Sequence, residues 1–211
     1  MKITKRKQKV MKIIIVVLVV IIILMTAFII YKKFISKSST SGSKVKVVDK
    51  IDNYGYYLED NDPKEYKDMY YQLQDVLNSK TVDEEAYAKL VARMLVFDFY
   101  NIDNKISKND IGGTQFVIEQ YRENFILEAS ETVYKYVEHN IYGDRTQKLP
   151  KVTKTTATDL KKATYAYNDI KDDNCYIIKV DISYEEDLGY PTTVEVKLLH
   201  NNDKLEVFYM K

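Results

Sequence analysis

The longest apolar stretch of the chain covers residues 13–31, which include no charged residue, Gly or Pro. As a helix, these 19 residues would extend about 28 Å at ~1.5 Å per residue, close to the ~30 Å hydrocarbon core of a bilayer. A secretory signal has a shorter apolar region and a cleavage site of small residues, whereas this run ends in Tyr31 and Lys32. The pattern predicts an uncleaved transmembrane helix over 13–31, with a cleaved signal as the less favoured alternative.

Farther along the chain, apolar residues recur with the spacing of amphipathic helices. A stretch of β-branched and aromatic residues over 45–58 comes first and predicts a strand. Two capping-box patterns, at 62–65 and 81–84, then predict helix starts. We expect three helices: over about 63–78, from the second box to about 100, and over about 114–140.

The C-terminal part changes to a period of two, which is typical of strands. Apolar and polar residues alternate over four segments: 165–167, 176–184, 192–198 and 205–209. Turn-forming residues at 187–191 and 201–204 predict hairpins between the last three. Helices followed by an antiparallel meander predict an α+β fold, with three helices packed on one side of a curved antiparallel sheet.

Charge divides the chain into two unequal parts. Residues 1–50 carry 12 Lys and Arg and one acid, Asp49, whereas residues 51–211 carry 20 basic and 30 acidic residues, a net charge of −10. An acidic domain is a poor nucleic-acid binder, and we expect no nucleic-acid partner. The basic flanks of the apolar run suit anionic lipid headgroups instead.

These observations predict four regions. Residues 1–12 form a basic tail in the cytoplasm, because this tail contains no acid and the bias of Lys and Arg favours that orientation. Residues 13–31 cross the cell membrane once, and the polar, Ser-rich residues 32–44 form a flexible linker. Residues 45–211 form an extracytoplasmic domain long enough for its own core. An inward-facing domain is the alternative.

The stretch 107–117 (SKNDIGGTQFV) contains the feature that most resembles a ligand-binding motif, two adjacent glycines before an apolar run. A nucleotide loop requires a different glycine spacing and a following Lys, which Gly112 and Gly113 lack. We interpret the stretch as a sharp interhelical turn, in which Asn109 and Asp110 tolerate turn backbone and the glycines supply positive φ.

Asp98 falls on or beside the apolar side of the second helix, near its C-terminus, where a carboxylate is disfavoured. A buried carboxylate needs donors, and the glycine-turn amides, a Tyr hydroxyl or Lys105 could supply them. We favour an Asp98 that joins the turn to the helix, over the alternative of a general base in a pocket. Tyr100 and Tyr121 complete the set of structural or pocket candidates.

Other chemistry finds little support in the sequence. His139, His200 and the single Cys175 lack the spacing of a zinc site, and the acidic clusters lack the pattern of a calcium loop. No nucleophile motif is present, so we expect no metal, no cofactor and no enzymatic activity. The composition, rich in Lys, Ile, Asn and Tyr and with four Arg, is typical of low-G+C Gram-positive bacteria.

The order of elements resembles the nuclear-transport-factor-two-like (cystatin-like) superfamily, cones in which a bent sheet wraps a long helix. With a single span and a basic tail, the chain looks like the bitopic assembly subunits of conjugative and type IV secretion systems. It also looks like uncharacterised membrane-anchored proteins of low-G+C bacteria over most of 45–211. That second resemblance rests on these residues: Tyr87 and Ala88, then Phe97, Asp98, Phe99 and Tyr100, then Asn104 and Lys105, then 109–116.

The resemblance implies a cone-like domain with no enzymatic activity to transfer. Combined with the anchor and the acidic domain, it leads us to expect a non-enzymatic membrane protein whose domain binds other envelope proteins, for example as an assembly scaffold. The lipid bilayer, through 13–31, is the other expected partner, and homo-oligomer formation is left open. The competing hypothesis is a ligand-binding or enzymatic cone with a pocket near Asp98.

Overall fold

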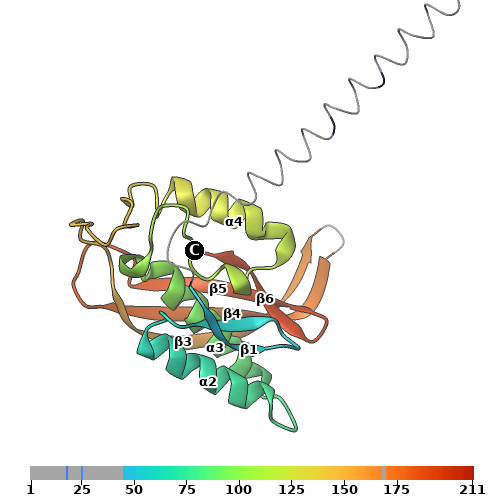
Figure 1. Cartoon of the computed structure of the whole chain (residues 1–211). Coiled ribbons are helices and arrows are strands. Elements are labelled where there is room, and N and C mark those ends of the chain that lie inside the picture. The colour runs from blue at the N-terminus through green and yellow to red at the C-terminus, as the bar shows by residue number, and fades with distance from the viewer. Residues whose placement is uncertain (1–17, 19–24, 26–44, 168–169) are drawn as a thin grey trace, which may run out of the picture. The chain divides into compact units, whose positions relative to one another are not determined.

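The computed structural model describes residues 18, 25, 45–167 and 170–211, and residues 45–211 form one compact unit (Figure 1). The predicted span 13–31 lies outside the described residues apart from Leu18 and Met25. Among the helices that can be described, none has the length and apolar character needed to cross a membrane.

Residues 45–211 have an α+β fold, as predicted, and their described part contains three α-helices and a curved antiparallel sheet. The helices of the described part are α2 (Lys64–Leu77), α3 (Glu84–Tyr100) and α4 (Glu119–Glu131), with short 3-10 turns η1 (Ile102–Asn104) and η2 (Thr114–Phe116) between α3 and α4. Strands β3 (Val152–Tyr167), β4 (Ile170–Tyr184), β5 (Thr193–Asn201) and β6 (Lys204–Met210) form the sheet in the order β3-β4-β5-β6. The predicted meander and its two hairpins are confirmed.

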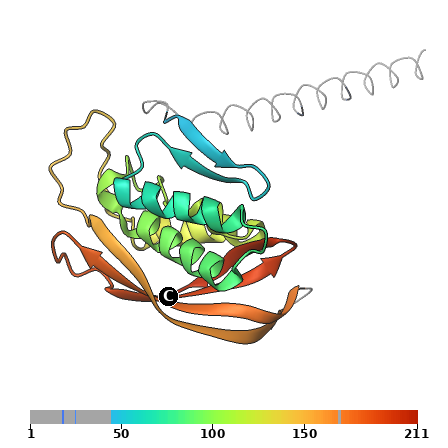
Figure 2. The same cartoon turned by 90° about the horizontal axis from the view of Figure 1, so that it is seen from below.

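The sheet curves beneath the helices (Figure 2). Register shifts interrupt the pairing of β3 with β4 at three places along β3. Bulges of this kind bend a strand and increase its twist, so they account for the curvature. The first part of β3 was not predicted, because 152–164 is rich in Thr and Lys and lacks apolar alternation; pairing with β4 makes it a strand.

The N-terminal segment differs from the prediction of one strand over 45–58. It forms a separate hairpin of β1 (Val47–Ile51) and β2 (Tyr56–Glu59), joined by a turn in which Gly55 has a φ of +70°. The single-strand prediction was wrong because this glycine permits a left-handed turn within the aromatic run. The hairpin brings Tyr56 and Leu58 into the core.

The first two helix starts are close to those predicted, but both predicted capping boxes were wrong. At α2 the Asp62 carboxylate accepts a hydrogen bond from the Glu59 N–H (2.7 Å) and does not cap the helix. At α3 the capping residue is Asp83, whose side chain accepts from the Ala86 N–H (3.1 Å), and not Thr81. Helix α3 ends at Tyr100, as expected.

The predicted helix over 114–140 is shortened at both ends. Val117 forms a parallel bridge with Val207, and the Ile118 N–H donates to the Val207 carbonyl (2.9 Å), so this segment joins the sheet. After α4 the chain continues in turns in which Tyr134 and Val137 are buried. Apolar residues at every fourth position predicted one long helix. They are instead distributed over three local structures: the bridge to β6, helix α4 and the turns after it.

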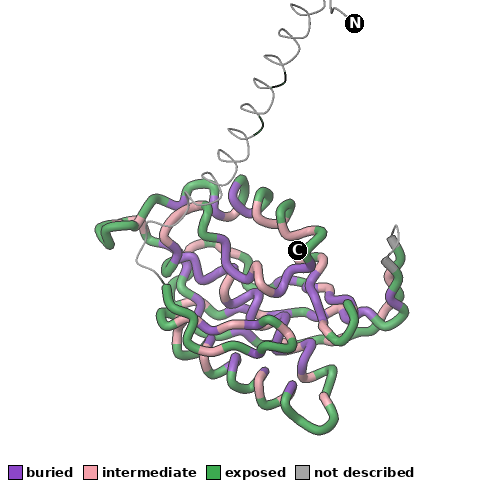
Figure 3. The backbone as a smooth tube through the Cα atoms, turned by 45° about the vertical axis from the view of Figure 1, so that its right-hand side comes forward, coloured by how far each residue is buried: buried purple, intermediate pink, exposed green. Residues whose placement is uncertain are grey.

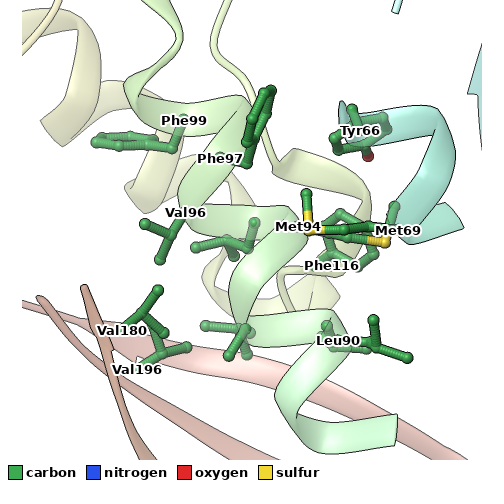
Figure 4. Packing of buried hydrophobic residues seen from close by; sticks show 14 of the residues in the cluster. Tyr66, Met69, Leu90, Met94, Val96, Phe97, Phe99, Phe116, Val180 and Val196 are labelled. Carbon is green, nitrogen blue, oxygen red and sulfur yellow. The ribbon is translucent and has the colours of Figure 1, made fainter. Parts of the chain in front are cut away.

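Helix α3 is the centre of the core, with eleven of its seventeen residues buried. In Figure 4, Val96 lies on the side of α3 that faces Val180 and Val196 of the sheet. Tyr66 and Met69 of α2 lie on the opposite side of α3. Because α3 is covered on several sides, its apolar residues do not form a single stripe. Its C-terminal end, where Asp98 lies, is therefore inside the domain.

Candidate functional site

The C-terminal end of α3 and the glycine turn meet at Asp98. The Gly113 N–H donates to Asp98 Oδ2 (2.6 Å), and Lys105 Nζ donates to Asp98 Oδ1. Lys105 is itself buried, with 8% of its surface exposed. The structure therefore supplies Asp98 with two of the donors that the sequence suggested, one turn amide and Lys105.

The two glycines are required for different reasons: Gly113 has the predicted positive φ, whereas for Gly112 that prediction was wrong and the requirement is space. A Cβ on Gly112 would lie 2.1 Å from the Asp98 carbonyl oxygen, far inside van der Waals contact. Gly113 has a φ of +76°, and a Cβ there would lie 3.0 Å from the Leu95 carbonyl oxygen. The turn can thus press its backbone against the last turn of α3.

Tyr134 makes a third connection to this end of α3. Its hydroxyl donates to the Phe99 carbonyl (2.5 Å) and accepts from the Gly112 N–H (3.3 Å). A carbonyl in the last turn of a helix has no intrahelical donor, so Tyr134 satisfies a group that burial would otherwise leave unpaired. Sequence reasoning missed this role because Tyr134 was assigned to the interior of the predicted helix.

Gln115 connects the turn to the N-terminal hairpin. Its Oε1 accepts from the Tyr57 N–H (2.9 Å), and its Nε2 donates to the Tyr57 carbonyl (3.3 Å) and to the Tyr66 hydroxyl (2.9 Å). The amide side chain thereby pairs with the edge of β2 as a neighbouring strand would. No pattern in the sequence predicted this contact, which joins residues 58 positions apart.

The carboxylates around Lys105 influence one another. Burial raises the pKa of Asp62 to about 6, although the hydrogen bond from Glu59 N–H acts in the opposite direction; the charge of Asp98 adds to the increase. Burial also raises the pKa of Glu59, and Asp62 and Asp98 contribute. Burial alone would lower the pKa of Lys105, but the Asp98 carboxylate raises it above its ordinary value, so the ammonium stays charged.

The remaining candidates lie around this cluster in different roles. Asp110 accepts from the Ile106 N–H (2.9 Å) and closes its own turn, and Asn109 is exposed, with its N–H directed to Ser107 Oγ (3.3 Å). Tyr100 is buried with its ring 4.9 Å from that of Phe99. Tyr121 is half-buried and packs against the apolar core from α4.

A second polar cluster, which the sequence did not indicate, surrounds His200. Its Nδ1 and its backbone N–H both lie 2.8 Å from Asp172 Oδ2, and its Nε2 lies 3.7 Å from Glu84 Oε2. Burial would raise the pKa of Asp172, but the N–H groups of His200 and Asn174 hold it below the ordinary value. No sequence pattern indicated this contact, because Asp172 is 28 positions away from His200.

Within the described part of the chain, no group of three or more His, Cys, Asp or Glu side chains is arranged to hold a metal ion. Cys175 is buried, and burial raises the pKa of its thiol. A buried thiol of this kind is a weak nucleophile.

Both oxygens of Asp98 accept hydrogen bonds from groups that hold the fold together. A general base needs an oxygen free to take a proton from a substrate, so the geometry favours Asp98 as the residue that fixes the glycine turn to α3.

Comparisons with protein families, with curated proteins and with solved structures found no match to this chain.

Proposed function

We propose that this chain is a non-enzymatic, single-span membrane protein whose domain at 45–211 lies outside the cell membrane and binds other envelope proteins. Residues 13–31 would cross the bilayer and residues 1–12 would remain in the cytoplasm. In its most specific form the proposal is an assembly scaffold of the envelope or of a secretion system. The chain would need neither a metal nor a cofactor for this role.

The anchor is supported by the sequence: an uncharged apolar run with Lys and Arg before it and a Ser-rich linker after it. A flexible linker of 13 residues has an r.m.s. length of about 20 Å. The domain would therefore work within a few nanometres of the membrane, where envelope proteins are its nearest neighbours.

The observation that carries the protein-binding proposal is a group of large side chains exposed in the turns after α4. Tyr142 is 90% exposed, Tyr136 77% and Ile141 50%. Single exposed apolar residues are ordinary, but these three lie within one short segment, 136–142, and Tyr is enriched at protein interfaces. The structural use of Asp98 and Lys105 supports a non-enzymatic role.

The finer description of the fold, a cone in which a bent sheet wraps α3, belongs to the same proposal. It is supported by the curvature of β3-β4-β5-β6 around α3 and by the resemblance of the element order to the nuclear-transport-factor-two-like superfamily. Folds of this breadth host many functions, so the resemblance supports an architecture and the exposed residues support the activity.

The proposal is tested by chemical crosslinking in cells that express the tagged full-length protein, followed by identification of the attached proteins. We expect a reproducible set of envelope proteins that disappears when residues 51–211 are deleted. The same set recovered with the deletion, or no attached protein at all, would overturn the proposal. Digestion of intact protoplasts tests the orientation: a protease-resistant domain would place it in the cytoplasm.

A second candidate function, the ligand-binding or enzymatic domain with a pocket near Asp98, draws on the group of Asp98, Lys105 and Asp62, in which burial raises the pKa of Asp62 to about 6. Asp62 lies within the electrostatic reach of Asp98 and Lys105. A small ligand-binding or enzymatic domain would then use this end of α3. Screening the domain against metabolite mixtures, with Asp62→Asn as the control, tests it: a ligand whose binding requires Asp62 would support this function over the scaffold.

A further inference from the structure

The segment between α4 and β3 is held in place by side chains that bind its own backbone. Gln147 Nε2 donates to the Tyr136 carbonyl (2.8 Å), and its Oε1 accepts from the Glu138 N–H (2.9 Å). Arg145 donates to the carbonyls of Asp103 (2.6 Å) and Lys105 (2.8 Å). The loop over 136–147 is therefore an ordered element fixed to the segment after α3.

This ordered loop directs its largest side chains outward. Tyr136, Ile141 and Tyr142 are at least half exposed, while Tyr134 and Val137 of the same segment are buried. Apolar surface left in water does not stabilise the fold, and the contact of Lys135 Nζ with the Tyr136 ring (5.4 Å to its centroid) leaves that side chain largely exposed, so the packing of the domain does not explain these positions. A partner that covers them would.

Helix α4, which leads into the loop, is also poorly covered. Only Ala129 and Ser130 of its thirteen residues are buried, and Leu127 is 62% exposed (Figure 3). A helix of this length depends on tertiary burial for its stability. By comparison, α3 buries most of its residues, so α4 presents a face that the domain leaves open.

The open face of α4 is acidic. Glu119, Glu123, Glu128 and Glu131 are exposed, and no basic residue lies in its last turn. Among the described residues, only Glu131 of these four has an ion pair, with Lys108 at 3.5 Å. The helix dipole favours Glu119 in the first turn but opposes Glu128 and Glu131 in the last, and neighbours of like charge repel, so the excess of carboxylates along this face is not explained by helix stability.

Helix and loop belong to one surface. Glu131 at the end of α4 contacts Lys108, and two residues earlier the Ile106 carbonyl accepts from the Asn140 N–H (2.8 Å), next to Ile141. In Figure 1, α4 runs directly into the turns of this loop along one side of the domain. We define the α4–loop surface as Glu119, Glu123, Leu127, Glu128, Glu131, Tyr136, Ile141 and Tyr142.

We propose that the α4–loop surface binds a basic segment of a partner protein that also carries apolar side chains. The aromatic and aliphatic residues would be covered by the apolar side chains, and Lys or Arg would pair with the glutamates. A second copy would bring two acidic faces together, and anionic lipid headgroups would repel the same face, so charge favours a cationic protein over both. This inference rests on the proposed protein-binding function and names its surface and partner chemistry.

The test uses the full-length protein in its membrane with the photoreactive residue p-benzoylphenylalanine in place of Tyr142. Tyr71 of α2 is the matched control, because it is also an exposed tyrosine and lies outside the surface. We expect attached proteins from position 142 but not from 71, with attachment peptides rich in Lys or Arg. The yield should fall severalfold with Glu123→Gln and Glu128→Gln together, and remain with Glu195→Gln, which replaces an exposed glutamate of β5 outside the surface.

The opposing outcomes separate this inference from the proposed function. Attachment at position 142 to lipid only, to a second copy of the chain, or to acidic protein segments would overturn the partner chemistry. Protein attachment from position 71 and not from 142 would leave the protein-binding function in place and reject this surface. Absence of protein attachment at both positions, together with no partner in chemical crosslinking, would reject both.

Discussion

Replacement of Asp98 by Asn tests whether the buried ion pair fixes the glycine turn to α3. The asparagine amide group can satisfy only one of its two present donors, the Gly113 N–H or Lys105, and would direct its own N–H groups at the other. Lys105 would then remain charged, buried and without its carboxylate. Removal of one partner from a buried pair costs about 3–5 kcal/mol, against a total stability of about 5–15 kcal/mol.

The assay is urea unfolding of the fragment 45–211, which contains the apolar core around α3. Circular dichroism is the suitable signal because the chain has no Trp. We expect Asp98→Asn to lower the free energy of unfolding by about 3–5 kcal/mol. The thermal midpoint should fall by about 10 °C for a domain of this size.

A double-mutant cycle separates the ion pair from general damage. Lys105→Met should lower the free energy of unfolding by less, about 1–3 kcal/mol. Asp98 still accepts the hydrogen bond from the Gly113 N–H, and the Asp98 side chain is 21% exposed to water. The double variant should be less damaging than the sum of the two by about 1–3 kcal/mol. A loss below about 1 kcal/mol for Asp98→Asn, or additive losses in the cycle, would refute the reasoning.

Three further predictions concern the glycine turn, Asp62 and the ordered loop. Gly112→Ala places a carbon 2.1 Å from the Asp98 carbonyl oxygen and should cost about 3 kcal/mol or more, whereas Gly143→Ala, with no neighbour within 4 Å and a φ of +72°, should cost about 1–2 kcal/mol. Equal losses in urea unfolding would contradict the close approach. The folded-state pKa of Asp62, about 6, is above its unfolded value, so its protonation stabilises the fold fully below about pH 4, and this stabilisation is lost as pH rises through 6. Asp62→Asn should therefore be more stable than the wild type by about 1–3 kcal/mol at pH 7.5 and equal to it near pH 4, and a difference independent of pH would exclude this origin. Arg145→Ala removes the hydrogen bonds to the Asp103 and Lys105 carbonyls after α3 and to the Glu138 carbonyl of the loop, so amide exchange over 136–147 should accelerate at least about tenfold while α3 stays unchanged; unaltered exchange would show that the loop is held by other contacts.

The fold class followed from local patterns because both periods are strong where one face of an element is buried. Strands β4 and β5 alternate over most of their length, and α2 carries apolar residues at helical spacing, whereas α3 is buried on several sides. The pattern failed where burial did not follow one element. Apolar residues occur at every fourth position over 114–140, as in a single helix. In the structure, however, Val117 pairs with β6 and Tyr134 packs against the end of α3.

The candidate site was predicted in part for the same reason. Asp98 stood out because a carboxylate on an apolar helix face needs donors, and Lys105 and the glycine turn were close enough in sequence to supply them. Gln115 and Tyr134 could not be found, because their partners are fixed by how distant segments pack. Asp62 was misassigned as a helix cap although its contact is local: the carboxylate turns back to the Glu59 N–H at the end of β2 and not forward to α2.

The sequence by itself determined the properties that sum over local residues: the apolar run at 13–31, the acidic balance of 51–211 and the succession of helices and strands. Tertiary structure alone decided which side chains meet and which remain exposed. The end of α4 and the loop after it illustrate the difference. Tyr134 and Tyr136 are both tyrosines and only one residue separates them, but Tyr134 is buried and Tyr136 is exposed. Burial depends on the packing of segments far apart in the chain, and no local pattern encodes that packing.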